Sequence, residues 1–353
     1  MSAAVRHGQP SFHPLRVVEI EVLTDDAVAL RFDVPEQLVS EFAFVPGQHV
    51  AVRVPQDEER RSYSVCSAPG APLRVGVRRI PGGAFSDAVL GRLRPGDELE
   101  VMTPTGRFGA ALPGLRRPGF VAAGSGITPI LAMVTAALED PEVERVSLID
   151  VNRSQRDVMF LDELADVKDR HPERFQVVHV LTREPQESEL LSVRPDAAGI
   201  ARIRRTLLAA VDGWFLCGPQ GMVTSVRDAL VADGVDVEQI HTELFHADTA
   251  SVESLPSVVG LDSVEVEARL GGRRSAYRMS ATDTVLDALL RTRGDAPYAC
   301  KGGVCGTCRA RVVEGSVAMA ASWALEPDEI ARGDVLTCQS RPTSDRLVVD
   351  FDA

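Results

Sequence analysis

The sequence predicts a multi-domain protein that combines an antiparallel β-barrel, a doubly wound α/β domain with a parallel sheet, and a small mixed α+β domain. Three observations predict this order. Short β-rich runs lie between Pro and Gly turns up to residue 112, apolar strands alternate with helical periodicity from residue 113, and a hairpin pattern with a cysteine group follows a linker. A length of 353 residues fits two or three domains. We place the domains at 1–112, 113–248 and 262–353, with 249–261 as the linker.

The composition is that of an ordinary globular protein, with 44% hydrophobic and 25% charged residues. A net charge of −13 argues against nucleic acid as a partner. The longest apolar runs, such as Ile127–Leu138, are too short to span a bilayer, and we expect no membrane association. No apolar signal-peptide core follows Met1, so we expect a cytoplasmic protein.

The first domain shows short strand patterns at regular spacing, which is typical of a small barrel or sandwich. One helix interrupts them, and Ser86 is its expected N-cap because Asp87 to Leu90 have helical character. The expected strands are Leu15–Leu23, Val28–Val34, His49–Val54, Tyr63–Ser67, Leu73–Ile80 and Glu98–Thr103.

The second domain alternates strands and helices, which predicts a parallel sheet with right-handed crossovers. The expected strands are Gly119–Ala123, Val146–Val151, Phe175–Thr182, Trp214–Cys217 and Ile240–Phe245. The expected helices are a run up to Glu139, then Val158–Arg170 and Gln220–Asp233.

The third domain begins with two strands, Val264–Leu270 and Ser275–Met279, which flank Gly271-Gly272 as in a tight hairpin. A helix is expected over Asp283–Arg293, with Gly294 just beyond its end. Further strands are expected near Arg309–Val313 and Leu347–Asp350.

Two motifs in the barrel are suited to a flavin nucleotide. In Arg61-Ser62-Tyr63-Ser64, the guanidinium can pair with pyrophosphate, the phenol can pack on the flavin, and the Ser64 hydroxyl can bond near flavin N5. Gly83 and Ser86 stand at a helix N-terminus, where backbone N–H groups bind anions. The residues leave FMN open as an alternative to FAD.

Three strand ends in the second domain are suited to a pyridine nucleotide, because ligands of doubly wound sheets bind at the carboxyl ends of strands. Gly124, Gly126 and Thr128 follow the first strand, and Gly218 and Pro219 follow Cys217 at a later one. Arg153 and Ser154 follow the second strand, where they would bind a 2′-phosphate and favour NADPH. Asp150 is close to them in the chain, so NADH stays possible.

The cysteines Cys300, Cys305, Cys308 and Cys338 have the spacing C-x4-C-x2-C, then 29 residues, then C. This is the ligand pattern of a plant-type [2Fe–2S] cluster. Zinc is the main alternative, although it usually takes two C-x2-C pairs and this chain has one. A cluster of this kind carries single electrons, so the residues predict an electron carrier or reductase.

Taken together, these motifs resemble the ferredoxin–NADP reductase superfamily with a plant-type ferredoxin fused at the C-terminus. The resemblance covers about residues 12–353 and is strongest to reductase subunits of diiron epoxidases that act on aryl-CoA thioesters in phenylacetate degradation. It rests on Arg61-x-Tyr63-Ser64, Gly82-Gly83-x-x-Ser86, Gly124 to Pro129, Cys217-Gly218-Pro219, Glu243-x-Phe245, and the cysteine run with Leu336 to Pro342.

The resemblance implies a β-grasp third domain and roles for single residues. Arg61, Tyr63 and Ser64 would bind FAD, with Gly83 and Ser86 at its pyrophosphate. Thr128 and Cys217 would line the nicotinamide, and Phe245 would lie against the flavin ring. Ser64 and Cys217 are thus the candidate catalytic residues, although Cys217 could equally be a buried structural thiol. The Arg-rich stretch Val193–Ile203 departs from the family pattern.

The implied activity is electron transfer from NADPH through FAD and the cluster to separate oxygenase subunits of a multicomponent monooxygenase. The sequence shows no repeated E-x-x-H diiron motif of its own. A Rieske-type or steroid hydroxylase is the alternative partner. A non-catalytic redox-sensing or zinc-binding scaffold is the alternative of another class.

Overall fold

The computed structural model describes residues 10–55, 59–80, 82–192, 197–208, 210–245, 255 and 263–353, apart from the side chains of residues 84, 197 and 207. Phe12–Phe245 belongs to one compact unit, and the described residues from 263 onward belong to another. The first unit contains both the predicted barrel and the predicted α/β domain. The boundary that we place at residue 112 therefore stays a prediction.

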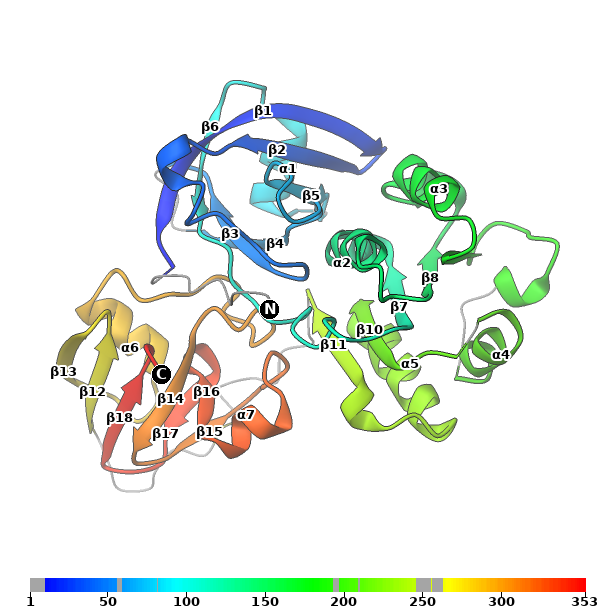
Figure 1. The fold of residues 1–353 in the computed structure, drawn as a ribbon. Coiled ribbons are helices and arrows are strands. Elements are labelled where there is room, and N and C mark those ends of the chain that lie inside the picture. The colour runs from blue at the N-terminus through cyan, green and yellow to red at the C-terminus, as the bar shows by residue number, and fades with distance from the viewer. Residues whose placement is uncertain are drawn as a thin grey trace. The chain divides into compact units, whose positions relative to one another are not determined.

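The first six strands form one antiparallel sheet in the order β4-β3-β6-β1-β2-β5 (Figure 1). An antiparallel bridge between Val65 and Val75 joins its two edges, so the sheet closes into the predicted barrel. Alternate residues such as Val17, Leu30 and Val101 point into its core. The strands are β1 (Phe12–Thr24), β2 (Ala27–Asp33), β3 (His49–Arg53), β4 (Arg61–Ser64), β5 (Arg74–Arg78) and β6 (Glu98–Met102).

The helix between β5 and β6 is α1 (Ala84–Gly91), and the expectation that Ser86 is its N-cap is wrong. Gly83 is the N-cap, and Ser86 lies inside the first turn. The buried Ser86 hydroxyl accepts a hydrogen bond from the Ile80 N–H at 3.0 Å. Ser86 therefore fixes the turn before the helix, and the helix starts earlier than the hydroxyl pattern indicates.

Five parallel strands form the second sheet, in the order β11-β10-β7-β8-β9, which confirms the doubly wound prediction. Its strands are β7 (Pro118–Ala123), β8 (Val146–Asn152), β9 (Phe175–Leu181), β10 (Gly213–Gly218) and β11 (Ile240–Leu244). Its helices are α2 (Ile127–Glu139), α3 (Leu161–Arg170), α4 (Ala197–Leu207) and α5 (Gln220–Ala232). Apolar residues of α2 and α3 share one core with Phe120, Leu148 and Phe215 of the sheet.

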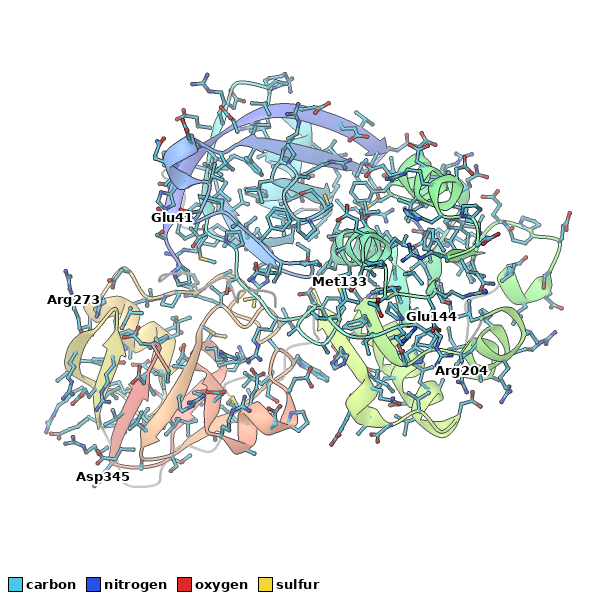
Figure 2. The ribbon with its side chains drawn as sticks, in the orientation of Figure 1. Glu41, Met133, Glu144, Arg204, Arg273 and Asp345 are labelled. Carbon is cyan, nitrogen blue, oxygen red and sulfur yellow. The ribbon has the colours of Figure 1, made fainter. Side chains whose placement is uncertain are left out.

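Two helices of the α/β part differ clearly from the sequence prediction. Helix α3 begins at Leu161 rather than Val158, because Gln155–Asp157 forms a separate 3-10 turn and Phe160 has a φ of +60°. Helix α4 is not predicted by the sequence. Its Arg204, labelled in Figure 2, is 2.8 Å through Nε from Asp233 Oδ2, at the end of α5. Tertiary ion pairing thus supports a helix with little local pattern.

One arginine holds the barrel against the α/β part of the same unit. Arg74 on β5 reaches Glu163 of α3 and Glu21 of β1, each at 2.6 Å. Its guanidinium also lies over the Phe160 ring, 5.0 Å from the centroid. These contacts join β5 of the barrel to the start of α3.

The C-terminal unit holds a five-stranded mixed sheet in the order β13-β12-β18-β14-β16, with β12 and β18 parallel. Its hairpin turn is confirmed, because Gly271 and Gly272 both have positive φ, at 63° and 67°. The fold is the predicted β-grasp. The elements are β12 (Val264–Leu270), β13 (Arg273–Met279), α6 (Val285–Thr292), β14 (Arg309–Glu314), β15 (Val317–Met319), α7 (Pro327–Ala331), β16 (Asp334–Leu336), β17 (Ser340–Pro342) and β18 (Arg346–Asp350).

The predicted linker lies outside the described residues, except for residue 255. Within the described parts of the chain, no helix combines the length and the apolar character needed to cross a bilayer.

Candidate functional site

The predicted flavin strand is β4, and its neighbours support a single binding surface. The Tyr63 ring packs on Phe85 of α1, with ring centroids 5.5 Å apart. This contact places Arg61 and Tyr63 beside the glycine turn that precedes α1. The Arg61 side chain is 43% exposed, and its guanidinium pairs with Glu59. Burial raises the pKa of Tyr63, which keeps the phenol neutral.

The N-terminus of α1 offers backbone donors rather than a hydroxyl. Gly82 has a φ of +76°, and Gly83 is the N-cap. The Ser86 hydroxyl is already bonded to Ile80, so an anion at this turn would be bound by the N–H groups. The Gly83 N–H already donates to the Ile80 carbonyl at 2.8 Å, so the donors for a pyrophosphate would be the N–H groups that follow Gly83 in the first turn of α1.

Ser64 connects the barrel to the last strand of the parallel sheet. Its hydroxyl, on a side chain that is 3% exposed, donates to Glu243 Oε2 at 3.2 Å across 179 positions of sequence. Glu243 is paired in register with Cys217 on the adjacent strand. Ser64, Cys217 and Glu243 therefore lie together, and the sequence prediction did not assign a role to Glu243.

Cys217 is fully buried and stays protonated. Its burial, together with the nearby Glu243 carboxylate, raises the pKa of Cys217 well above the ordinary thiol value. A neutral thiol is a poor nucleophile but can pack against an apolar ring. Cys217 is thus suited to lining a nicotinamide and unsuited to covalent catalysis.

The two glycine-containing strand ends meet at backbone distance. A Cβ on Gly126 would lie 2.1 Å from the Cys217 carbonyl oxygen, so only glycine fits there. A Cβ on Gly76 of β5 would lie 2.6 Å from Cγ2 of Thr128. Thr128 is 2% exposed, and its hydroxyl donates to the Ser125 carbonyl at 3.0 Å. The Gly124–Gly126 turn is therefore packed between β10 and the barrel.

Arg153 and Ser154, at the end of β8, do not stand free. The Ser154 hydroxyl donates to Asp157 Oδ2 at 2.6 Å, and Arg153 pairs with Asp157 and Asp26. Arg78 joins this group through both carboxylates, and no sequence motif marks Asp157, Asp26 or Arg78. The only local signal was the spacing of Ser154 and Asp157 across one 3-10 turn.

The four cysteines of the C-terminal unit lie as two pairs. A hydrogen bond with the Cys305 thiol, and burial, raise the pKa of Cys300. A hydrogen bond with the Cys338 thiol, and burial, raise the pKa of Cys308 well above its ordinary value, and Cys305 adds a smaller effect. The chain therefore brings Cys338 to the loop that carries the other three thiols.

The loop geometry depends on glycine and on two residues near Cys338. Gly303 and Gly306 have φ of +77° and +68°, and the Gly302 N–H donates to Cys300 Sγ at 3.3 Å. Thr337 Oγ1 donates to the Cys308 carbonyl at 2.8 Å, and Gln339 Nε2 donates to the Lys301 carbonyl at 2.8 Å. Thr337 and Gln339 thus hold the two cysteine segments together, a function that spacing alone did not indicate.

These residues fit a [2Fe–2S] cluster, which four thiolates share between two irons. Two thiol pairs and an N–H group aimed at a cysteine sulfur match that donor set. Among the described residues, no group of three or more His, Cys, Asp or Glu side chains could hold a single metal ion.

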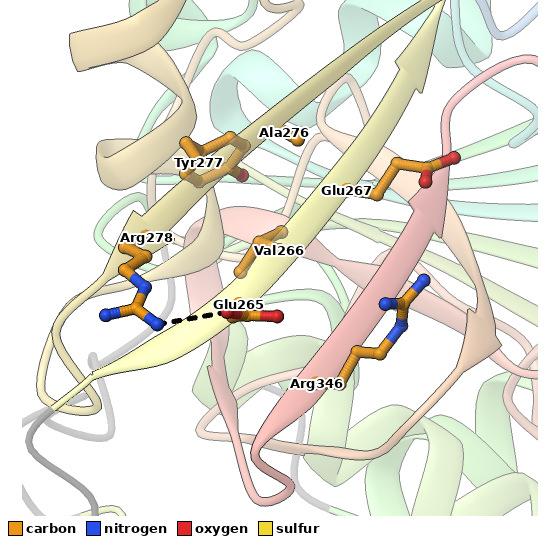
Figure 3. A pocket seen from close by; sticks show the side chains of 7 residues that line it. All are labelled: Glu265, Val266, Glu267, Ala276, Tyr277, Arg278 and Arg346. Carbon is orange, nitrogen blue, oxygen red and sulfur yellow. Dashed lines mark hydrogen bonds and ion pairs between the residues drawn. The ribbon is translucent and has the colours of Figure 1, made fainter.

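A shallow pocket on the C-terminal unit lies away from the cysteine loop. It is formed on β12, β13 and β18 by Glu265, Val266, Glu267, Ala276, Tyr277, Arg278 and Arg346 (Figure 3). Glu265 and Arg278 form an ion pair at 3.0 Å across its wall. None of the predicted site residues lines it, and we assign it no function.

Three family profiles match consecutive parts of the chain. Residues 14–109 match the oxidoreductase FAD-binding domain, 120–228 the oxidoreductase NAD-binding domain, and 269–343 the 2Fe-2S iron-sulfur cluster binding domain. The cofactors of the chain are therefore FAD, NAD(P)H and a [2Fe–2S] cluster. The roles of the single site residues stay predictions.

Two relatives match nearly the whole chain. One of the subunits of 1,2-phenylacetyl-CoA epoxidase from Escherichia coli (strain K12) is 40% identical, over 97% of this chain and 98% of the relative. The ferredoxin reductase component of 3-ketosteroid-9-alpha-monooxygenase from Rhodococcus rhodochrous is 33% identical, over 98% of this chain and 99% of the relative.

The fold also matches a solved structure, that of phthalate dioxygenase reductase. The two share 22% identity with a TM-score of 0.61, and the match covers 97% of this chain and 98% of that one. At this identity the match supports the fold alone.

Proposed function

Because this chain belongs to the family of oxygenase reductases that join FAD, NAD and [2Fe–2S] domains, we propose that it is the reductase of a phenylacetyl-CoA epoxidase. It would pass electrons from NAD(P)H through FAD and the cluster to separate oxygenase subunits. The identity of 40% to the epoxidase relative, over nearly the full length of both chains, carries this proposal. The identity of 33% to the steroid monooxygenase reductase makes that class the alternative.

When bound, FAD accepts a hydride from the nicotinamide and releases electrons one at a time, so the protein supplies placement and electrostatics. Arg61 and the N–H groups in the first turn of α1 would bind its pyrophosphate, and Tyr63 would pack against its ring system. Ser64 is held by Glu243, so its hydroxyl stays in one orientation at the junction of barrel and sheet. Thr128 and Cys217 would line the nicotinamide side, and Phe245 would lie against the flavin ring.

A hydride brings its own hydrogen to the flavin, so the Ser64–Glu243 pair would instead receive the proton that is released when the electrons leave. Ser64 donates to the carboxylate, and a carboxylate beside a hydroxyl can accept a proton through it. The buried Cys217 thiol, kept neutral, excludes water from the same place. On the cluster side, Gly302, Thr337 and Gln339 would orient the thiolates.

We also propose that the protein works in the cytoplasm. None of the six cysteines forms a disulfide in the described structure, and cysteines stay without disulfides in a reducing compartment.

Reconstitution tests the partner. The purified protein is combined with the catalytic subunits of phenylacetyl-CoA epoxidase, and in parallel with the oxygenase component of 3-ketosteroid-9-alpha-monooxygenase. We expect that nucleotide oxidation coupled to substrate turnover is at least about tenfold faster with the epoxidase subunits than with the steroid oxygenase. This ratio corresponds to a difference of about 1.4 kcal/mol in activation free energy. Faster coupled turnover with the steroid oxygenase would mean that the protein is the reductase of that class instead. A visible spectrum without flavin bands and cluster absorbance would contradict both assignments.

A further inference from the structure

A cluster of anion donors follows β8 and surrounds a carboxylate of the chain itself. The Ser154 hydroxyl donates to Asp157 Oδ2 at 2.6 Å, and Arg153 Nη2 pairs with Asp157 Oδ1. Arg78 Nη2, from β5 of the barrel, lies 3.6 Å from the same Oδ1. Three donors from two parts of the unit therefore converge on one side chain that is 17% exposed.

A second carboxylate balances the charge of this cluster. Asp26, in the turn between β1 and β2, lies 3.0 Å from Arg78 Nε and 3.5 Å from Arg153 Nη2. The charges of the two guanidinium groups and the two carboxylates sum to zero. Because both arginines are shared between both carboxylates, neither arginine is committed to one partner.

The cluster adjoins the turn predicted to approach the nucleotide. A Cβ on Gly124 would lie 3.2 Å from Arg78 Nη1, so Arg78 covers the Gly124–Gly126 turn at the end of β7. Strand β7 is hydrogen-bonded to β8, whose end carries Arg153 and Ser154. The donors thus stand at the carboxyl ends of two neighbouring parallel strands, where this class of sheet binds its ligand.

Asp157 is ionised at neutral pH. Burial acts to raise the pKa of Asp157, but hydrogen bonds from Ser154 and Arg153 outweigh it and lower the pKa below its ordinary value. A carboxylate and a phosphate are recognised by the same guanidinium and hydroxyl donors. The two residues that the sequence assigns to a 2′-phosphate are therefore engaged by an anion of the protein.

We propose that Asp157 occupies the 2′-phosphate position of NADPH, and that this phosphate binds by displacing Asp157 from Arg153 and Ser154, with Arg78 as an additional donor. This inference rests on the proposed use of a pyridine nucleotide. NADH has no such phosphate and leaves the Asp157 contacts in place. Asp157 is thus a specificity-determining residue that weakens binding of the phosphorylated nucleotide.

The test measures binding without turnover. The holoenzyme is titrated with 2′,5′-ADP and with 5′-ADP by calorimetry, for the wild type, Asp157→Asn and Asp157→Ala. Each variant removes the three partly exposed contacts of Asp157, and each contact is worth about a factor of two in affinity. We therefore expect 2′,5′-ADP to bind about tenfold more tightly to both variants than to the wild type. The affinity for 5′-ADP should change by less than about twofold. Arg153→Ala should weaken the binding of 2′,5′-ADP by about tenfold and should weaken the binding of 5′-ADP much less.

The matched control is Asp162→Asn, which removes the same charge from an exposed position in the first turn of α3. Equal tightening in this control would show a general charge effect and overturn the proposal. Unchanged or weaker 2′,5′-ADP binding in Asp157→Asn would overturn it as well. Failure of the proposed function would show separately. In that case neither NADH nor NADPH would reduce the flavin of the wild-type protein, whereas the binding titration could still be measured.

Discussion

Replacing Gly126 by alanine tests the close contact on which the nucleotide site depends. The added Cβ would lie 2.1 Å from the Cys217 carbonyl oxygen, 2.5 Å from its carbon and 2.9 Å from the Gly218 nitrogen. All three are backbone atoms of β10, so no side-chain rotation relieves the overlap. The φ of −60° at Gly126 is ordinary for alanine, so the backbone conformation itself adds no strain.

The magnitude follows from these contacts. Overpacking in a close-packed region costs about 1–3 kcal/mol, and a clash with three backbone atoms lies at or above the upper end. The usual gain of about 0.4–1 kcal/mol for Gly to Ala offsets little of it. A unit of this size loses about 2–4 °C of melting temperature per kcal/mol, so we expect a decrease of about 6–12 °C. Displacement of the turn should also raise the nucleotide KM by about tenfold or more.

Thermal unfolding followed by circular dichroism, with ferricyanide reduction for the KM, measures both effects. Gly221→Ala is the matched control, because nothing lies within 4 Å of its added Cβ in the first turn of α5. This control should be neutral or more stable by up to about 1 kcal/mol. A Gly126→Ala protein that melts within about 2 °C of the wild type, with an unchanged KM, would refute the reasoning.

Three further predictions concern the cysteines. Cys305→Ser should lose the cluster, measured as iron content and visible absorbance, while the nucleotide still reduces the flavin; iron at the wild-type level would contradict the ligand assignment. Gly303→Ala should lower the iron content to less than about half of the wild-type value, because Gly303 has a φ of +77° and the added Cβ would lie 2.9 Å from Gln339 Cγ. The control Gly302→Ala should retain iron, because the nearest atom to its added Cβ lies 3.8 Å away. Burial raises the pKa of Cys66 to about 12 from 9.0, so the unfolded thiol ionises first as pH rises. This contribution to stability is complete below about pH 9 and is lost towards pH 12 at about 1 kcal/mol per pH unit. Chemical denaturation of Cys66→Ala should show a shallower decline over that range, and parallel curves would argue against the burial effect.

Much of the fold follows from local patterns in the chain. Period-two alternation predicted the barrel strands, and the Gly271-Gly272 pair predicted the hairpin, because these features depend on neighbours in sequence. Helix α4 was not predicted, since its arginines are stabilised by Asp233, which lies just past the end of α5. The start of α1 was misplaced because the Ser86 hydroxyl bonds backward to Ile80 rather than capping the helix.

The candidate site divides in the same way. The cysteine spacing predicted the cluster ligands, but only the fold brought Cys338 beside Cys308 and showed that Thr337 and Gln339 join the two segments. Likewise, Arg61-x-Tyr63-Ser64 was visible as a motif, whereas the partner of Ser64 lies 179 positions away. A motif identifies the donors, and the packing decides which of them are already occupied.

By itself, the amino-acid sequence predicted the order of three domains, the cofactor classes and the candidate ligand cysteines of this protein, because periodicity, turn residues and spacing are encoded over a few neighbouring positions. The tertiary structure alone decided that Glu243 meets Ser64, that Gly126 touches β10, and that Asp157 engages Arg153 and Ser154. Such contacts join residues from different strands and turns, and they form only when packing excludes water and brings buried polar groups to their partners.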